Sequence, residues 1–292
     1  MPVIQTVRSD IQELRGVHLY HFATSNCSQR VRFVLEEKGI QWESHHISLI
    51  KCENATPEFI AINPKGVVPV LVHDGTTVIE SNDIIQYLDS YFDGPRLSPT
   101  KELDQAYLKT SLEQSSKFQA AFKLLMHEFL FKPVRRMNAD ELSEYERGTR
   151  NKELAAFMRE FSSAKGFSES KIIAAIAEAE CVLRNLEERL ANSHWLSGQE
   201  FGLADISWVV NVHRFSHMRY PMESYPRVGA WLGRMRSRPA YKQAISKYES
   251  NRALTLFRVY TFIRQLRKTS VGSMLEKNRS EIKSVSVLET ND

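Results

Sequence analysis

The first third of the chain switches repeatedly between two hydrophobic patterns, one typical of strands and one typical of helices. Alternation over residues 17–22 predicts a strand, and apolar positions at helical spacing then continue up to Gly39 and predict a helix. The same signals predict a strand within 42–49, a short helix from Thr56 to Asn63, two strands at 70–73 and 77–79 about an Asp74-Gly75 turn, and a helix at about 80–92. The order β-α-β-α-β-β-α, with a parallel first pair of strands, indicates an α/β domain at 17–93.

Strand signals stop at the Gly/Pro-rich stretch 94–99, which we interpret as a linker. Helices are then predicted at about 100–131, 142–162, 168–191, 203–213, 226–237 and 239–248. We therefore expect an N-terminal leader at 1–16 and an all-helical second domain at 100–250.

The extension 251–292 begins with a basic amphipathic helix at 251–268. This helix could pack over an active-site mouth, contact a second subunit or touch an anionic membrane surface. We favour packing, which is the most common fate of such a helix. Residues after about 270 are polar and are expected to be a mobile tail.

Composition narrows the class of protein without defining an activity. The chain has 292 residues, of which 42% are hydrophobic and 25% charged, as is typical of a soluble globular protein. A net charge of +4 without a dense Lys/Arg run before residue 251 argues against nucleic-acid binding. Neither a signal peptide nor a transmembrane segment is expected, because no long apolar run is present. Three scattered cysteines indicate neither a disulfide framework nor a zinc site, and they suit the reducing cytoplasm.

The turn Ser25-Asn-Cys-Ser28 lies where the first helix begins. The first backbone N–H groups of a helix have no intrahelical partner, and the helix dipole adds partial positive charge there. A thiolate at this spot is stabilised, whether it belongs to Cys27 or to a bound thiol ligand. The alternative is an ordinary cap, because serine is a common N-cap residue and a lone cysteine is usually a small buried hydrophobe.

Histidines, a proline and a second helix start are further polar features of this domain. His45 and His46 are adjacent in a predicted strand, so they point to opposite faces and no metal pair is expected. Pro69 lies at a strand entry, where its missing N–H is tolerated and where a cis bond could occur. Ser81 is a natural N-cap for the helix that follows, and the acidic Glu80 suits its dipole.

Four motifs in this order resemble the cytosolic glutathione transferase superfamily over about residues 17–248. They are Ser25-Asn-Cys-Ser-Gln-Arg-Val-Arg32, Val68-Pro69, Glu80-Ser81 and Leu203-Ala-Asp205. The resemblance implies a thioredoxin-like, glutathione-binding domain at 17–93 and an all-helical substrate-binding domain. The Ser-x-Cys turn looks most like the zeta class and the related reductive dehalogenases of chlorinated hydroquinones, and the layout is similar to bacterial β-etherases. The resemblance also implies glutathione as co-substrate, no metal, and a homodimer.

The resemblance also assigns roles to individual residues. Ser25 matches the serine that donates a hydrogen bond to the glutathione sulfur and favours the thiolate. The other implied contacts are the backbone of Val68 with the cysteinyl part, Pro69 as the family's cis-proline, Glu80 and Ser81 with the γ-glutamyl group, and Lys51 and Lys65 with the glycine carboxylate. For Glu80 and Ser81 the alternative is a plain capped helix, and for the two lysines it is solvated surface.

Cys27 has two possible roles in the families that the turn resembles. In dehalogenase-like members the matching cysteine forms a mixed disulfide with glutathione, whereas in zeta-like members it assists without being required. The helix start and Arg30 are neighbours that could stabilise its thiolate. A passive thiol is equally compatible with the sequence.

In the second domain the resemblance implies a pocket for the second substrate between the two domains. Tyr107, Phe118, Phe122, Met126 and Trp208 could line it, although apolar stripes in helices usually belong to the core. Asp205 matches a structural capping motif of the family. The family's Ser or Thr three residues earlier is Gly202 here, which is still an acceptable N-cap.

Two hypotheses of different classes follow from the sequence. The first is an enzyme that activates glutathione and delivers the thiolate to a hydrophobic, aromatic electrophile by conjugation, β-aryl ether cleavage, isomerisation or reductive dehalogenation. The second is a glutathione transferase fold that serves as a ligand-binding or interaction module without catalysis. The four motifs together favour the enzyme, and the basic C-terminal helix leaves room for the module.

Overall fold

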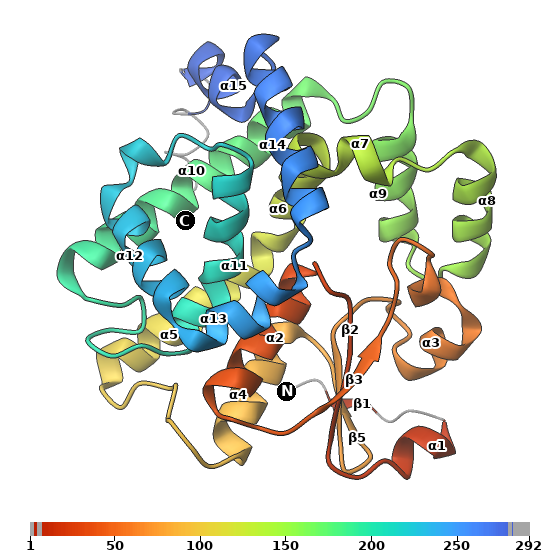
Figure 1. Cartoon of the computed structure of the whole chain (residues 1–292), viewed down its shortest axis with the longest axis vertical. Coiled ribbons are helices and arrows are strands. Elements are labelled where there is room, and N and C mark those ends of the chain that lie inside the picture. The colour runs from red at the N-terminus through yellow and green to blue at the C-terminus, as the bar shows by residue number, and fades with distance from the viewer. Residues whose placement is uncertain (1–2, 5–7, 280–281, 283–292) are drawn as a thin grey trace. The chain divides into compact units, whose positions relative to one another are not determined.

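The computed structural model describes residues 3–4, 8–279 and 282, and its contacts divide the chain into two compact units (Figure 1). Unit 1 comprises the described residues within Met1–Ser98, Met137–Ser162 and Pro239–Glu249. Unit 2 comprises those within Pro99–Arg136, Ser163–Arg238 and Ser250–Asp292.

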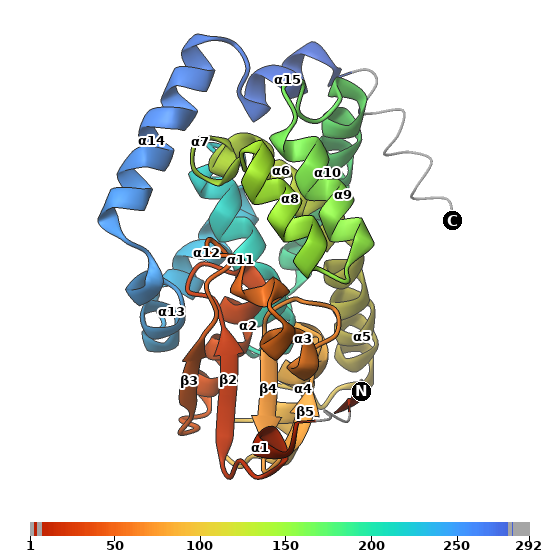
Figure 2. The ribbon, with the colours of Figure 1, turned by 90° about the vertical axis from the view of Figure 1, so that its right-hand side faces the viewer.

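A five-stranded mixed sheet in the order β1-β5-β4-β2-β3 forms the centre of unit 1 (Figure 2). The strands are β1 (Val3–Ile4), β2 (Val17–His21), β3 (Glu43–His46), β4 (Val70–His73) and β5 (Thr76–Val78). Only β2 and β3 pair in parallel; the other neighbours are antiparallel. The strands expected at 17–22, 42–49, 70–73 and 77–79 are therefore present. The expected leader, by contrast, contributes β1, which pairs with β5.

Helices cover both faces of this sheet. The helices of unit 1 are α1 (Ser9–Gln12), α2 (Asn26–Glu37), α3 (Pro57–Ile62), α4 (Ser81–Tyr91), α8 (Ala139–Gly148), α9 (Lys152–Ser162) and α13 (Pro239–Ala244), with 3₁₀ turns at Glu53–Ala55 and Ser246–Tyr248. On one face, residues of α1 and α3 pack with alternate strand residues such as Tyr20, Val70 and Val72. Figure 1 shows α2 and α4 on the other face.

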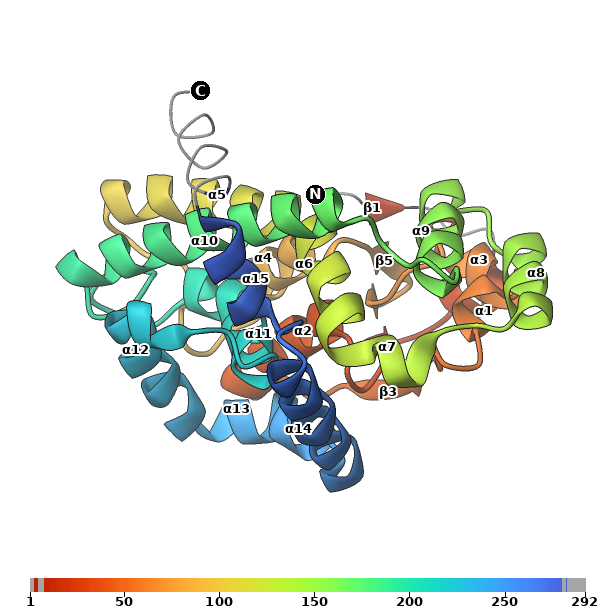
Figure 3. The ribbon, with the colours of Figure 1, turned by 90° about the horizontal axis from the view of Figure 1, so that it is seen from above.

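A single helical region expected around 142–162 is two helices, α8 and α9, which lie side by side (Figures 1 and 3). The prediction missed two local caps. Asn138 and Glu141 form a capping box at the start of α8, and the side chain of Asn151 accepts from the backbone N–H of Leu154 near the start of α9. Both helices belong to unit 1 by their contacts. The predicted domain boundaries, which rest on sequence pattern, stay a prediction.

Unit 2 is all-helical, as expected of the second domain. Its helices are α5 (Glu102–Lys117), α6 (Gln119–Met126), α7 (Lys132–Arg135), α10 (Glu169–Asn192), α11 (Leu203–His217), α12 (Pro226–Ser237), α14 (Asn251–Leu266) and α15 (Val271–Lys277), with a 3₁₀ turn at Met222–Ser224. The helix expected over 100–131 is interrupted after α5, and a π-helical turn at His127–Phe131 follows α6. Among the described residues, no helix is long and apolar enough to cross a membrane.

The start of the C-terminal extension packs within unit 2, whereas packing of its amphipathic helix over an active-site mouth stays a prediction. Phe257 of α14 contacts Phe131, and Arg264 donates to both the backbone and the carboxylate of Glu128. Part of the stretch expected to be mobile is instead the capped helix α15, whose Ser270 side chain accepts from the N–H of Ser273. The prediction for residues 280–281 and 283–292 concerns residues outside the described part of the chain.

Candidate functional site

The start of α2 carries the hydroxyl of Ser25, which accepts one hydrogen bond and can still donate its own proton. Ser25 is the N-cap of α2: its Oγ accepts from the backbone N–H of Ser28 at 3.3 Å, and its carbonyl accepts from Gln29 at 2.8 Å. A hydroxyl can accept and donate at once, so this cap leaves the Ser25 proton available for a ligand. Ser25 is half-buried, whereas Ser28 is fully buried and its Oγ accepts from the N–H of Phe22. The turn is therefore fixed by the buried Ser28, while the hydroxyl of Ser25 remains partly accessible.

Cys27 lies in the first turn of the same helix as a free, half-buried thiol. Its neighbour Arg30 is buried, and this burial lowers the pKa of Arg30, while the nearby Cys27 sulfur opposes that shift. A guanidinium beside a helix N-terminus favours a negative charge on sulfur. The helix start beside Arg30 therefore suits a negatively charged sulfur of a bound ligand.

Arg30 also connects the turn to the start of α4. Its Nη1 donates to Ser81 Oγ at 2.8 Å in a buried contact. Ser81 was expected to be the N-cap of this helix, but it is the first helical residue, and Glu80 occupies the cap position with φ 65° and ψ 115°. The expectation failed because the Ser81 hydroxyl accepts from Arg30 and Glu80 adopts left-handed φ, a conformation that no sequence pattern reveals.

The side chain of Glu80 meets Lys65 at the surface of unit 1. Lys65 Nζ lies 2.5 Å from Glu80 Oε1, and the two side chains are 57% and 46% exposed. An exposed ion pair contributes only about 0–1 kcal/mol to stability. A ligand that carries both an ammonium and a carboxylate can therefore replace the pair at little cost. Lys51, the other candidate lysine, is exposed in the turn after β3.

The loop that enters β4 is fixed by buried amides. The Val68–Pro69 peptide bond is cis, as the resemblance implies, and both residues are buried. Asn63 donates to the carbonyl of Val67 and Asn54 to that of Gly66, each at 2.8 Å. No local pattern in the sequence distinguishes these two asparagines, because their partners depend on the loop geometry.

Gly66 shows how closely this loop is packed. Its φ is +62°, and an added Cβ would lie 3.1 Å from both the carbonyl oxygen of Asn54 and Cδ1 of Ile60. The position therefore favours glycine for its backbone conformation and for lack of space.

Arg32 supports the turn from behind and was also missed, since the sequence placed it on a polar face of the helix. It is fully buried; it donates to the carbonyl oxygens of Ala23 at 2.7 Å and Ala244 at 3.0 Å, and its guanidinium lies 3.8 Å from the ring centroid of Tyr248. Its Nη1 also donates to Nδ1 of His21 at 2.9 Å. Two of its partners are more than 200 residues away in the sequence, so no local signal could reveal them.

Burial and the charge of Arg32 lower the pKa of His21 from 6.5 to about 3. Because Nδ1 accepts from Arg32, the proton of the neutral ring lies on Nε2, which is 2.8 Å from Ser44 Oγ. The carbonyl of Ala23, which precedes the Ser25 turn, is thus held by Arg32. Arg32 in turn depends on the neutral form of His21, because only that form has an Nδ1 lone pair to accept its N–H.

The residues expected to line a substrate pocket lie in unit 2. Phe118, Phe122, Met126 and Trp208 are buried, and Phe118 contacts both Phe122 and Trp208. These contacts are typical of a helical core. Tyr107 is less buried and lies under the guanidinium of Arg189 at 4.1 Å, and desolvation raises its pKa to about 12. Their role in a pocket stays a prediction.

Asp205 organises the start of α11. Its fully buried carboxylate accepts from the backbone N–H groups of Leu196, Ser197 and Gly202 and from Nε1 of Trp231, at 2.7–3.1 Å. Gly202 has no side chain with which to cap the helix, but Ser197 Oγ accepts from the N–H of Ala204 at 3.1 Å. A serine of the preceding turn therefore takes over part of the cap that the family motif places at Gly202.

Comparisons with known proteins give matches to both halves of the chain. Residues 19–96 match the family described as "Glutathione S-transferase, N-terminal domain", and residues 171–234 match "Glutathione S-transferase, C-terminal domain". "Glutathione S-transferase TCHQD" of Arabidopsis thaliana is 26% identical over 278 residues, covering 89% of this chain and 100% of the relative. "Protein LigF" of Sphingobium sp. is 27% identical over 242 residues, covering 78% of this chain and 93% of the relative.

A solved structure shows the same fold. The crystal structure titled "Beta-etherase LigF from Sphingobium sp. strain SYK-6" matches with a TM-score of 0.72 and 26% identity, covering 80% of this chain and 99% of that one. A thioredoxin-like N-terminal domain with a mixed sheet followed by an all-helical domain is thus the fold of the chain, as expected. The chain belongs to the glutathione transferase superfamily, a family of enzymes whose co-substrate is glutathione.

Proposed function

We propose that the protein binds glutathione on unit 1, activates its thiol at Ser25 and directs the thiolate at a hydrophobic, aromatic electrophile. The observation that carries this proposal is the geometry of Ser25. Its Oγ accepts from the helix N–H of Ser28, so its own proton remains to donate to sulfur. A hydrogen bond to the thiolate lowers the pKa of the bound thiol and raises the fraction of nucleophile at neutral pH.

The remaining residues supply a place for each end of the tripeptide. Glu80 suits the γ-glutamyl ammonium, and Ser81 and the first N–H groups of α4 suit its carboxylate. The contact between Arg30 and Ser81 places a buried positive charge between this site and Cys27. Val68, beside the cis Pro69, offers its backbone to the cysteinyl part, and Lys65 or Lys51 offers an ammonium to the glycine carboxylate.

The reactions that we consider share one first step. The glutathione sulfur attacks an electrophilic carbon, a C–S bond forms, and the leaving group departs with its electron pair as a phenolate or a halide. The likeness to a β-etherase at 26% identity supports aryl ether cleavage as one version. Cis–trans isomerisation differs in that the thiolate leaves again.

Reductive dehalogenation would add a step on Cys27. Its thiolate would attack the sulfur of the aryl–glutathione thioether, the arene would leave and take a proton, and Cys27 would carry a glutathione disulfide. A second glutathione thiolate would then release oxidised glutathione and regenerate the Cys27 thiolate. The positive charge of Arg30 beside Cys27 supports such a thiolate.

Turnover of wild type, Ser25→Ala, Cys27→Ala and Cys27→Ser tests the proposal. The assay supplies glutathione with a panel of chlorinated hydroquinones, aryl β-ethers and a generic aryl halide, and mass spectrometry follows the protein. We expect Ser25→Ala to lower kcat by about 10²-fold, the order of effect of losing one donor to a developing anion. Retention of activity by both Cys27 variants would define a serine-type enzyme.

Other outcomes separate the alternatives. A glutathione adduct on Cys27 in the wild type, with stalled Cys27 variants, would establish the reductive cycle. Glutathione binding without turnover of any electrophile would contradict the enzyme and favour a binding module. Full activity of Ser25→Ala would remove the role proposed for its hydroxyl.

The proposal extends to the assembly and location of the protein. The family resemblance supports a homodimer, and the small number of scattered cysteines in the sequence supports the cytoplasm. A pocket for the second substrate among Tyr107, Phe118, Phe122, Met126 and Trp208 is likewise carried by the resemblance. Sedimentation equilibrium would test the dimer directly.

A further inference from the structure

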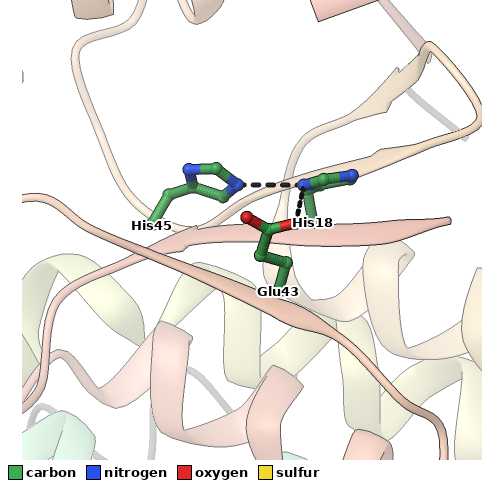
Figure 4. A group of neighbouring side chains, drawn as sticks. All are labelled: His18, Glu43 and His45. Atoms are coloured by element: carbon green, nitrogen blue, oxygen red, sulfur yellow. Dashed lines mark hydrogen bonds and ion pairs between the residues drawn. The ribbon is translucent and has the colours of Figure 1, made fainter. Parts of the chain in front are cut away.

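The side chains of His18, Glu43 and His45, all of types that can bind metal ions, meet at the edge of the sheet in unit 1 (Figure 4). His18 Nδ1 lies 2.9 Å from His45 Nε2 and 3.4 Å from Glu43 Oε2. The parallel register explains the cluster: His18 pairs with Glu43, and Tyr20 pairs with His45. Because side chains alternate across a strand, all four residues share one face.

The hydrogen bonds of His18 prepare its ring to bind a cation. Nε2 of His18 lies 2.8 Å from the carbonyl oxygen of Arg15. A carbonyl only accepts, so in the neutral ring Nε2 carries the proton and the lone pair lies on Nδ1, which faces His45 and Glu43. Metal-bound histidines are typically held in this way, with the outer N–H given to a carbonyl or carboxylate.

The second histidine is also held in place. The ring of His45 stacks on Tyr20 with centroids 4.4 Å apart and an angle of 14° between the planes. His18 is 5% exposed, so its position is set by the sheet, whereas the Glu43 side chain is 68% exposed. The cluster therefore has one buried imidazole, one stacked imidazole and one exposed carboxylate on the solvent side, from which an ion can enter.

We propose that His18, Glu43 and His45 bind one divalent transition-metal ion, with zinc as the reference ion. Two imidazoles and a carboxylate are a common zinc ligand set, and they leave a fourth position for water. In a tetrahedral site with Zn–N of about 2.0–2.1 Å, two nitrogen ligands lie roughly 3.3 Å apart. The present 2.9 Å separation of the two nitrogens thus needs to widen by only a few tenths of an ångström.

Binding also requires one change of tautomer. When His18 Nδ1 carries the lone pair, Nε2 of His45 donates to it in the metal-free state. The ion replaces that proton, which moves to Nδ1 of His45 through solvent, so that both rings remain neutral ligands. The ion would fasten the edge strand β3 to β2, a role independent of glutathione chemistry.

The sequence pattern predicted no metal, and it contains no local signal for this site. His45 was compared with its neighbour His46, but His46 pairs with His21 across the strands and lies on the other face. The actual partner of His45 is 27 residues earlier in the chain. Only the register of two strands brings them together.

The test is zinc binding to the full chain without an affinity tag, stripped with a chelator and assayed without glutathione. Competition with a chromophoric chelator measures affinity and stoichiometry, and the absorption of bound Co²⁺ reports the ligand type. We expect one ion per chain and a cobalt spectrum of nitrogen and oxygen ligands. His45→Ala and Glu43→Gln should each weaken binding by more than the ~10–100-fold typical of losing a group that only orients a ligand.

His46→Ala is the matched control, because it removes an exposed imidazole from the adjacent position of the same strand. It should keep the wild-type affinity, and zinc should raise the Tm of wild type and His46→Ala but not of His45→Ala. Equal affinity in wild type and His45→Ala, a cobalt–thiolate charge-transfer band, or no one-to-one binding would overturn the site. None of these readouts depends on turnover, so they are separable from the proposed function.

Discussion

The starts of α2 and α11 both need acceptors for backbone N–H groups, but they differ in how far their polar groups are satisfied within the protein. Each helix begins with a side-chain oxygen that accepts a backbone N–H: Ser25 for Ser28, and Ser197 for Ala204. At α11 the buried carboxylate of Asp205 accepts four further donors from unit 2. At α2 the cap is half-buried, and its hydroxyl proton is left for a ligand.

In our proposal, this difference separates a structural helix start from a functional one. A buried polar group whose hydrogen bonds are all made within the protein stabilises the fold, because any loss leaves partners unsatisfied. A polar group near solvent whose proton is not used within the protein can donate a hydrogen bond to a ligand. In this chain both starts lie in family motifs, and only the hydrogen bonds of the folded state tell them apart.

Asp205→Ala should have the largest effect on stability. It leaves three backbone N–H groups and Nε1 of Trp231 without their acceptor in a buried site. Each unsatisfied donor costs about 1–3 kcal/mol, so we expect a loss of roughly 4 kcal/mol or more in the free energy of unfolding. Chemical denaturation followed by circular dichroism measures it. A loss below about 1 kcal/mol, typical of a surface change, would contradict the structural role.

Low pH should reduce the stability of the protein through protonation of His21, which accepts a hydrogen bond from Arg32 of α2. Its pKa is about 3 in the folded protein and about 6.5 when unfolded, so between these values the unfolded state binds the extra proton. The contribution of His21 to stability is therefore complete above pH 6.5 and falls as the pH falls, by about 1.4 kcal/mol per pH unit.

Comparison with His21→Gln isolates this contribution from that of other buried histidines, such as His127 in unit 2. The difference in the free energy of unfolding between wild type and His21→Gln should shrink by about 2 kcal/mol from pH 6.5 to pH 5. A difference that stays constant over this range would show that His21 titrates normally in the folded protein.

The smallest effects come from the two cap serines, which form a matched pair. Ser25→Ala and Ser197→Ala each remove one bond to a helix N–H, and Ser197→Ala also removes a hydroxyl that hydrogen-bonds Asp205, so we expect a stability cost of about 1 kcal/mol for Ser25→Ala and a larger one for Ser197→Ala. Only Ser25→Ala should lower the rate with glutathione, because only that hydroxyl faces a ligand in our proposal. Equal rate losses in both variants would assign the effect to helix stability, and the contrast between the two helix starts would fail.

The elements of the fold were predictable where the signals are local. Proline at the first helical position and apolar spacing placed the helix at Pro226–Ser237 with both ends correct. Prediction failed where a single side chain sets the start of a helix. Asn138 and Asn151 cap two helices in a stretch expected to hold one. The break after Lys117 and the π-helical turn at His127 likewise depend on packing that periodicity does not encode.

The sequence by itself determined the superfamily, the α/β and all-helical halves, and the positions of Ser25, Val68-Pro69 and Glu80-Ser81, because these depend on short-range order along the chain. Tertiary structure alone decided which polar groups meet. It buried Arg30 against Ser81 and Arg32 against His21, paired Lys65 with Glu80, and brought His18 to Glu43 and His45. These contacts follow from strand register and helix packing, which here join residues from 11 to 51 positions apart.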